Sequence, residues 1–164
     1  MKIRAVKREE LSIVRELAHA IWPDTFKAIL SNEQIQYMLN WMYNLNYLEN
    51  QLDQGHHFYV AELESNPVGF IGIEPNHPEK GLTKIHKIYI LPNQQGLGIG
   101  KKLIEFVKKS AIQSEMDGLL LNVNRFNKAV DFYKAIGFNI IFEENIDIGN
   151  GYLMEDYVMK LDLR

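Results

Sequence analysis

The sequence predicts an α+β fold (mixed α/β) in which one mixed sheet carries helices on its faces. In the first third of the chain, hydrophobic residues recur at the spacing of amphipathic helices. After residue 55 the period changes, and strand-like segments follow one another with turn residues between them. Two further helical segments separate the later strands. The expected order of elements is β-α-α-β-β-β-α-β-α-β-β, with about seven strands.

One short strand and two helices are expected before residue 55. Residues 3–6 form the strand, and residues 9–21 form the first helix. This helix should end near Pro23, because the residue before a proline disfavours helical dihedral angles. The second helix begins at Ser31, which is followed three residues later by a glutamine in a capping-box pattern. It extends or restarts towards Gly55, where it stops.

Strands predominate in the rest of the chain. Six are expected, over residues 56–63, 67–74, 83–91, 118–123, 139–146 and 152–163. Two helices lie between the later ones, over about residues 101–114 and 127–136, and Gly137 supplies a C-terminal stop for the second.

Composition narrows the range of functions. At 164 residues the chain is expected to be a single domain, residues 1–164. It has no cysteine, which excludes disulfides, thiolate catalysis and cysteine-ligated metals. No segment resembles a signal peptide or a membrane span, so we expect a cytoplasmic protein without a membrane partner. The net charge of −3 argues against nucleic-acid binding.

The segment QGLGIGKK at residues 95–102 places three glycines between a predicted strand and a predicted helix. A phosphate-binding P-loop and a dinucleotide-binding fingerprint both require other residues at fixed positions, and the segment lacks them. The spacing Gln95-x-x-Gly98-x-Gly100 instead suits a turn whose backbone N–H groups converge on a pyrophosphate at a helix N-terminus. The alternative is a glycine-rich turn that binds no ligand.

Two segments resemble the GNAT superfamily of acetyl-CoA-dependent N-acetyltransferases. KIYILPNQQGLGIGKKL resembles the family's acetyl-CoA-binding segment, and NVNRFNKAVDFYKAIGF resembles the segment that follows it. The resemblance implies the GNAT fold, a central mixed, mostly antiparallel sheet with helices on both faces, and acetyl-CoA as cosubstrate. The end of the chain, IGNGYLMEDYVMKLDL, resembles bacterial spermidine/spermine acetyltransferases of the PaiA type.

The resemblance also implies roles for individual residues. The strand backbone before the loop would pair with the pantetheine arm, the turn would hold the pyrophosphate, and an asparagine would hydrogen-bond the cofactor arm. Tyr133 would give a proton or a hydrogen bond to the departing CoA thiolate. The implied cofactor-binding residues are Ile88, Tyr89, Ile90, Gln95, Gly96, Leu97, Gly98, Ile99, Gly100, Lys101, Asn127 and Tyr133.

Direct transfer also needs a base, because an alkyl ammonium with a pKa of about 10 must lose its proton before it attacks. Some relatives carry a glutamate on the strand before the loop, where Lys84 and His86 occupy its expected face in this chain. Other relatives use a glutamate on the next strand, where this chain has Asn122. His86 is therefore the first candidate for the catalytic base and Glu74 the second. We expect no metal, since the adjacent His56 and His57 would point to opposite faces of a strand.

The expected function is N-acetylation of a primary amine, on a small molecule, with a polyamine favoured, or on a peptide. Transfer would be direct, without an acyl-enzyme. The alternatives are a CoA-binding regulatory module with a degenerate acceptor site, and a nucleotide-binding protein outside the family. A homodimer is expected by analogy with relatives. Aromatic residues of the first third, some of which would line the acceptor pocket, are Trp22, Phe26, Tyr37, Trp41 and Tyr43.

Overall fold

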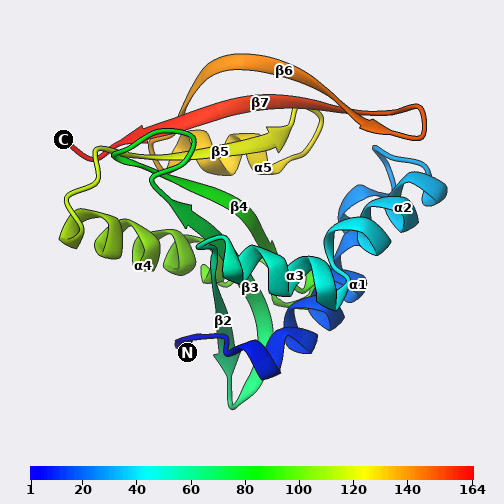
Figure 1. Cartoon of the computed structure of the whole chain (residues 1–164), viewed down its shortest axis with the longest axis horizontal. Coiled ribbons are helices and arrows are strands. Elements are labelled where there is room, and N and C mark those ends of the chain that lie inside the picture. The colour runs from blue at the N-terminus through cyan, green and yellow to red at the C-terminus, as the bar shows by residue number, and fades with distance from the viewer.

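A seven-stranded sheet in the order β1-β2-β3-β4-β5-β7-β6 organises the chain. The structure is a computed structural model that describes residues 1–164 (Figure 1). The strands are β1 (Lys2–Ala5), β2 (His57–Leu63), β3 (Asn66–Pro75), β4 (Leu82–Ile90), β5 (Gly118–Asn124), β6 (Asn139–Gly149) and β7 (Tyr152–Asp162). The α-helices are α1 (Leu11–Phe26), α2 (Asn32–Met42), α3 (Leu45–Asp53), α4 (Ile99–Gln113) and α5 (Ala129–Ala135).

The sheet is mixed and mostly antiparallel, as predicted. Only β4 and β5 run parallel, and they pair over Leu82–Ile85 and Gly118–Leu121. Both strands continue beyond these residues, so their carboxyl-terminal halves diverge (Figure 1). This divergence opens the sheet at its centre.

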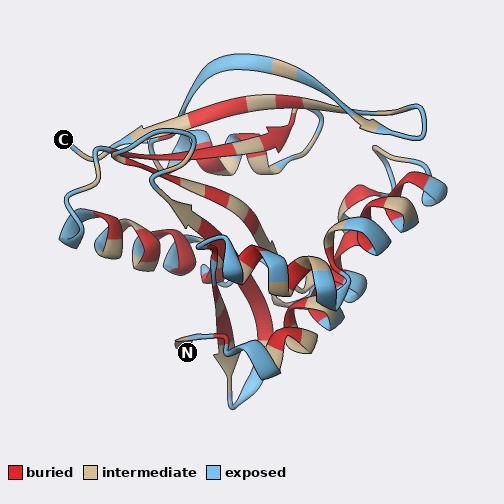
Figure 2. Cartoon of the chain, viewed as in Figure 1, coloured by how far each residue is buried: buried red, intermediate tan, exposed pale blue.

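Helices cover both faces of the sheet, which confirms the predicted layers. On one face, α4 and α5 bury residues such as Leu103 and Val130 against β3, β4 and β5. On the other face, α1, α2 and α3 form a second core that includes Trp22, Met38 and Phe70. Figure 2 shows the buried residues on the inner sides of these helices, while the edge strand β6 is mostly exposed.

The prediction that the first helix ends near Pro23 is wrong. The helix continues through Pro23 to Phe26, and the backbone N–H of Lys27 still bonds to Pro23 O at 3.1 Å. Proline removes one helical hydrogen bond, and the carbonyl left without it belongs to His19, an exposed residue with access to water. The last turn also buries Trp22 and Phe26, which stabilises the helical conformation there.

Side-chain caps explain why three helices, rather than two, precede β2. Ser31 accepts a hydrogen bond from the backbone N–H of Gln34 at 3.1 Å, as the capping pattern predicts. Asn44 caps a separate helix in the same way, through the N–H of Tyr47 at 2.9 Å. The helical segment therefore restarts as α3.

None of the helices is long and apolar enough to cross a membrane.

Candidate active site

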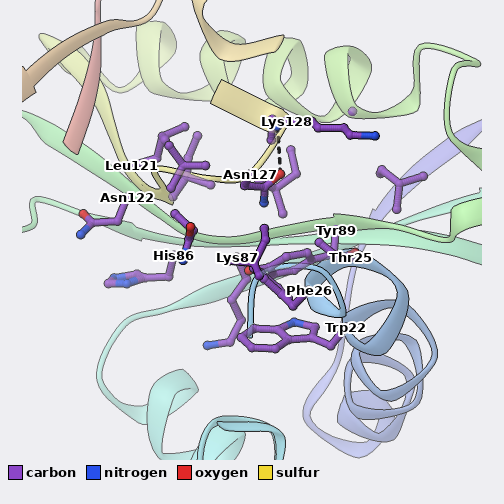
Figure 3. A pocket seen from close by; sticks show the side chains of 18 of the residues that line it. Trp22, Thr25, Phe26, His86, Lys87, Tyr89, Leu121, Asn122, Asn127 and Lys128 are labelled. Atoms are coloured by element: carbon purple, nitrogen blue, oxygen red, sulfur yellow. Dashed lines mark hydrogen bonds between the residues drawn. The ribbon is translucent and has the colours of Figure 1, made fainter. Parts of the chain in front are cut away.

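One cavity of about 1170 Å³ lies where β4 and β5 diverge (Figure 3). It extends from the glycine-rich turn to the aromatic residues of α1 and α2. Of the predicted site residues, the cavity wall contains His86, Ile88, Tyr89, Ile90, Gln95, Gly96, Gly98, Ile99, Gly100, Lys101, Asn127 and Tyr133. Leu97 is the exception, since it is 61% exposed and does not line the cavity. The structure thus brings together nearly all of the residues singled out in the sequence.

The end of β4 has a free backbone edge beside the cavity. Ile88, Tyr89 and Ile90 pair with β3 on one side, whereas pairing with β5 stops at Ile85. The side chain of Gln95 donates a hydrogen bond to Ile90 O at 3.3 Å, which links the glycine turn to this edge. Unpaired strand groups beside a cavity can accept an extended ligand as an additional strand would.

The glycine turn joins this edge to the N-terminus of α4. Gly96 and Gly98 have φ values of +81° and +79°, a region that residues with a side chain rarely adopt. No atom lies within 4 Å of the Cβ position at either residue. Gly98 is the N-cap of α4, so unbonded N–H groups of the first helical turn lie next to open space. This arrangement suits an anion.

Tyr133 and Asn127 lie at the opposite wall, on or before α5. Tyr133 is buried, with its ring 5.3 Å from that of Phe132 and 5.8 Å from that of Phe138. Burial raises the pKa of its phenol, so the hydroxyl keeps its proton at neutral pH. The side chain of Asn127 accepts a hydrogen bond from Ala129 N at 2.9 Å (Figure 3). This bond fixes Asn127 at the start of α5.

A network of hydrogen-bonded polar side chains crosses the sheet beside the cavity. The sequence analysis did not predict that these side chains meet. Lys84 Nζ donates to Asn122 Oδ1 at 2.6 Å, and Asn122 Nδ2 donates to Asp156 Oδ2 at 3.2 Å and to Glu144 Oε2 at 2.9 Å. Asp156 is 5% exposed, lines the cavity, and has no partner for its Oδ1 atom. Burial is the main cause that raises the pKa of this carboxyl group.

A β-bulge in β4 turns the His86 side chain towards the face of the sheet that carries Glu74. Gly72 pairs with Lys87 and Ile73 pairs with Ile85, so His86 is the extra residue on β4. Its Nε2 atom lies 2.9 Å from Glu74 Oε1. Burial lowers the pKa of His86 to about 4, although the hydrogen bond with Glu74 acts in the opposite direction. The ring is therefore uncharged at neutral pH and is a weak proton acceptor.

Aromatic rings form the far end of the cavity, where one or two of the five aromatic residues of the first third were expected and four are found. Trp22, Phe26, Trp41 and Tyr43 line it. Tyr37 does not, because its hydroxyl donates to Ile148 O at 2.8 Å and so ties α2 to the β6–β7 hairpin.

Lys87 was also not predicted from the sequence as a residue of this site. Its Nζ atom donates to Gln51 Oε1 at 2.8 Å and lies 5.3 Å from the centre of the Tyr43 ring. Burial lowers the pKa of this lysine to about 7. The centres of the Tyr47 and Phe58 rings lie 5.8 Å and 5.7 Å from the same Nζ atom. An ammonium group here is held by aromatic faces and one amide oxygen.

Comparison with known proteins identifies the class to which this fold and cavity belong. The family model of the GNAT acetyltransferase domain matches residues 54–140, which include β2, β3, β4, the glycine turn, α4, β5 and α5. The chain belongs to the GNAT acetyltransferase family.

Individual relatives resemble this chain over part of their lengths. The N-acetyltransferase YjgM of Escherichia coli is 32% identical over 99 residues, which cover 59% of this chain and 56% of YjgM. The peptidyl-lysine N-acetyltransferase YjaB of Salmonella typhimurium is 34% identical over 91 residues, 54% of each chain. The chain therefore spans about half the length of these curated relatives.

Among solved structures, the PaiA N-acetyltransferase of Thermoplasma acidophilum in complex with coenzyme A superposes with a TM-score of 0.83. The match covers 98% of both chains at 24% identity. At this identity the likeness shows the fold, which is that of the GNAT acetyltransferases.

Proposed function

We propose that this protein transfers an acetyl group from acetyl-CoA directly to a primary amine. The observation that carries the proposal is the divergence of β4 and β5, which leaves the β5-facing edge of Ile88–Ile90 without a partner strand next to the glycine turn. The pantetheine arm of CoA has amide groups that can pair with this strand edge, and the pyrophosphate of CoA suits the N–H groups at the start of α4. Family membership supports the same cosubstrate.

In the proposed reaction, acetyl-CoA lies in the cavity with its thioester near the end of β4. The nitrogen of the neutral amine attacks the thioester carbonyl and the C–N bond forms. The C–S bond breaks to release the CoA thiolate, and the proton that the nitrogen loses as the amide forms converts the thiolate to the free thiol. Tyr133 stabilises this thiolate, since burial keeps its hydroxyl protonated and its side chain lines the cavity. No acyl-enzyme intermediate is needed.

Asp156 is the proton acceptor that the structure favours. It lines the cavity, one of its carboxylate oxygens has no partner, and burial raises its pKa towards the working range of a general base. The base predicted from the sequence, His86, also lines the cavity, but a pKa of about 4 makes it a weak proton acceptor. The catalytic role of His86 stays a prediction. A cytoplasmic location and a homodimer also stay predictions.

The acceptor in this proposal is an alkyl amine, for which the aromatic end of the cavity supplies apolar walls and ring faces. A polyamine is favoured by the resemblance of the C-terminal segment to the PaiA type. The name of YjaB, a peptidyl-lysine N-acetyltransferase, supports a lysine side chain of a peptide as the other acceptor. Both present a primary amine at the end of an alkyl chain.

The test is release of free thiol from acetyl-CoA in the presence of polyamines, amino acids or lysine peptides. We expect amine-dependent release, with a mass increase of one acetyl group on the accepted amine. If CoA binds but no amine supports release, the protein is instead a CoA-binding module with a degenerate acceptor site.

A further inference from the structure

Three side chains that are far apart in the sequence converge on one side of the sheet, and one of them, His86, lines the cavity. His56 precedes β2, Glu74 lies in β3, and His86 is the bulge residue of β4. The Nε2 atoms of His56 and His86 lie 3.1 Å and 2.9 Å from the same oxygen, Glu74 Oε1. One ligand atom from each residue lies within 4.8 Å of the other two.

The fold holds these groups in place. The bulge directs His86 to the side of the sheet that Glu74 occupies. The backbone N–H of His56 bonds to Gln51 O at 2.9 Å, which anchors the residue to the end of α3. The rings of His56 and His86 stack with centroids 4.6 Å apart and planes inclined by 18°. The three groups are therefore held close together, and the two stacked rings need only rotate to direct both Nε2 lone pairs at one ion.

Hydrogen bonding alone explains the cluster poorly. A third imidazole nitrogen, His77 Nδ1, lies 3.4 Å from the same Glu74 oxygen. Three ring nitrogens thus surround one carboxylate oxygen that has two lone pairs. Ligand atoms that lie 2.0–2.1 Å from a tetrahedral zinc ion are about 3.3 Å from one another, which is close to the distances of the His56 and His86 nitrogens from Glu74 Oε1.

The protonation states also agree with ligation. Burial is the main cause that lowers the pKa of both His56 and His86, so their nitrogens carry lone pairs at neutral pH. Burial acts to raise the pKa of Glu74, but the bond with His86 and the neighbouring rings outweigh it, and the carboxyl group is ionised.

We propose that His56, Glu74 and His86 bind a divalent transition-metal ion of the zinc type, with His77 beside it as a candidate fourth ligand. Two imidazoles and one carboxylate suit zinc, whereas magnesium and calcium prefer oxygen ligands. The sequence-based expectation of no metal is therefore replaced, because it was drawn from His56 and its neighbour His57 alone. The metal partner of His56 is instead His86, brought close by the β2–β3–β4 register.

Metal binding at this site does not require acetyl transfer, but it bears on which residue acts as the base. A zinc ion on His86 Nε2 would occupy the lone pair that His86 needs to accept a proton from the amine. With the metal bound, Asp156 is the residue that remains to act as the base.

The test is equilibrium dialysis of the tag-free full chain, first stripped with a chelator, against Zn²⁺, with bound metal counted by mass spectrometry. We expect one Zn²⁺ per chain, retained in excess Mg²⁺. Glu74→Gln and His86→Ala should each weaken zinc binding by at least about 100-fold, since loss of outer-shell partners alone costs 10–100-fold. Bound Co²⁺ should show the visible absorption of nitrogen and oxygen ligation, and each substitution should abolish it.

His57→Ala is the matched control, because His57 is exposed and adjacent to His56. This variant should bind zinc like the wild type. Absence of saturable zinc binding by the wild type, or equal loss in His57→Ala and His86→Ala, would overturn the proposal. Circular dichroism verifies folding, and His56→Gln replaces any variant that does not fold. A titration with CoA on the same samples distinguishes failure of this site from failure of the proposed acetyl transfer.

Discussion

Tyr133 combines two properties that a thiolate-stabilising group needs. It is 6% exposed, in contact with Phe132 and Phe138, and its side chain reaches the wall of the cavity. Its position on the apolar face of α5 would also fit a residue that only packs in the core. The sequence pattern does not separate these two roles, but a substitution that removes only the hydroxyl does.

We predict that Tyr133→Phe lowers kcat for acetyl transfer about 100-fold, because one hydrogen-bond donor to the leaving thiolate is lost. The affinity for CoA and the melting temperature should stay close to those of the wild type, since the ring contacts remain. Steady-state thiol release and a CoA titration measure these quantities. An unchanged kcat would remove Tyr133 from the mechanism.

Asp156 leads to a prediction about both activity and stability. Its Oδ1 atom is unpartnered, and its carboxyl group faces Glu144 of β6, Lys84 of β4 and Arg125 after β5. Burial raises the pKa above the unfolded value, with Glu144 adding to the rise while Asn122, Lys84 and Arg125 oppose it. The folded state therefore binds the proton more tightly than the unfolded state. Stability from this group is present below the unfolded pKa of about 3.9 and is lost as the pH rises through the native pKa.

Asp156→Asn removes this loss of stability at high pH, because the amide stays neutral. The amide oxygen can still accept a hydrogen bond from Asn122. We predict that its free energy of unfolding exceeds that of the wild type by about 1 kcal/mol near pH 7, and that the difference disappears near pH 4. The variant should also have a kcat about 100-fold lower. Urea unfolding at several pH values and thiol release measure the two effects. A wild-type kcat, or a variant less stable at pH 7, contradicts the role given to Asp156.

At the scale of elements, the glycine turn joins the free edge of β4 to the N-terminus of α4. Gly98 has a φ of +79°, and nothing lies within 4 Å of its Cβ position. Gly151, at the tip of the β6–β7 hairpin, has a φ of +78° and equally open surroundings. The two glycines have the same backbone requirement but different neighbours, which makes them a matched pair.

We predict that Gly98→Ala and Gly151→Ala each lower the free energy of unfolding by about 1–2 kcal/mol, because alanine is strained at this φ. Only Gly98→Ala should weaken CoA binding, by about 10-fold or more, because it disturbs the N–H groups proposed to hold the pyrophosphate. Calorimetric titration with CoA compares the two variants. Equal CoA affinity would show that the turn does not hold the cofactor.

Local patterns in the sequence predicted most of the elements and part of the cavity wall. The glycine spacing located the turn, and Gly137, with a φ of +109°, ends the α5 segment as predicted. Ser31 was a correct cap because capping depends on residues three positions apart. Such signals lie within one element or its neighbour, where spacing in the chain reflects spacing in the molecule.

Features that depend on strand register could not be predicted. Asp156 meets Asn122 because β7 pairs with β5 in a particular register, and His56 meets His86 because of a bulge between β3 and β4. A shift of one residue in either strand would turn these side chains to the other face. The continuation of α1 through Pro23 likewise depends on tertiary packing of Trp22 and Phe26, which outweighs the local preference of the proline.

At the scale of the whole molecule, the acceptor end of the cavity is built by segments from opposite ends of the chain. Tyr37 of α2 donates to Ile148 O of β6, and Gln34 Nε2 donates to Leu153 O of β7 at 3.1 Å. Figure 1 shows the β6–β7 hairpin tip next to α2. Ile146, Ile148 and Met154 of this hairpin line the cavity, so its position sets the shape of the acceptor end.

We predict that Tyr37→Phe raises KM for the amine about 5-fold, which corresponds to loss of one hydrogen bond of about 1 kcal/mol, and leaves CoA affinity unchanged. Tyr152→Phe is the control, because the rings of Tyr152 and Tyr37 pack 5.4 Å apart and the Tyr37 bond to Ile148 is retained. Steady-state kinetics with the preferred amine tests both. A change in CoA affinity without a change in KM for the amine would place the hairpin at the wrong end of the cavity.

The central claim is that the divergence of β4 and β5, together with the glycine turn, forms a binding site for acetyl-CoA. Calorimetric titration of the wild-type chain with acetyl-CoA, and separately with ATP and NAD, tests this most directly. The account predicts saturable binding of one acetyl-CoA per chain and no comparable binding of ATP or NAD. Binding of ATP or NAD while acetyl-CoA fails to bind would contradict it.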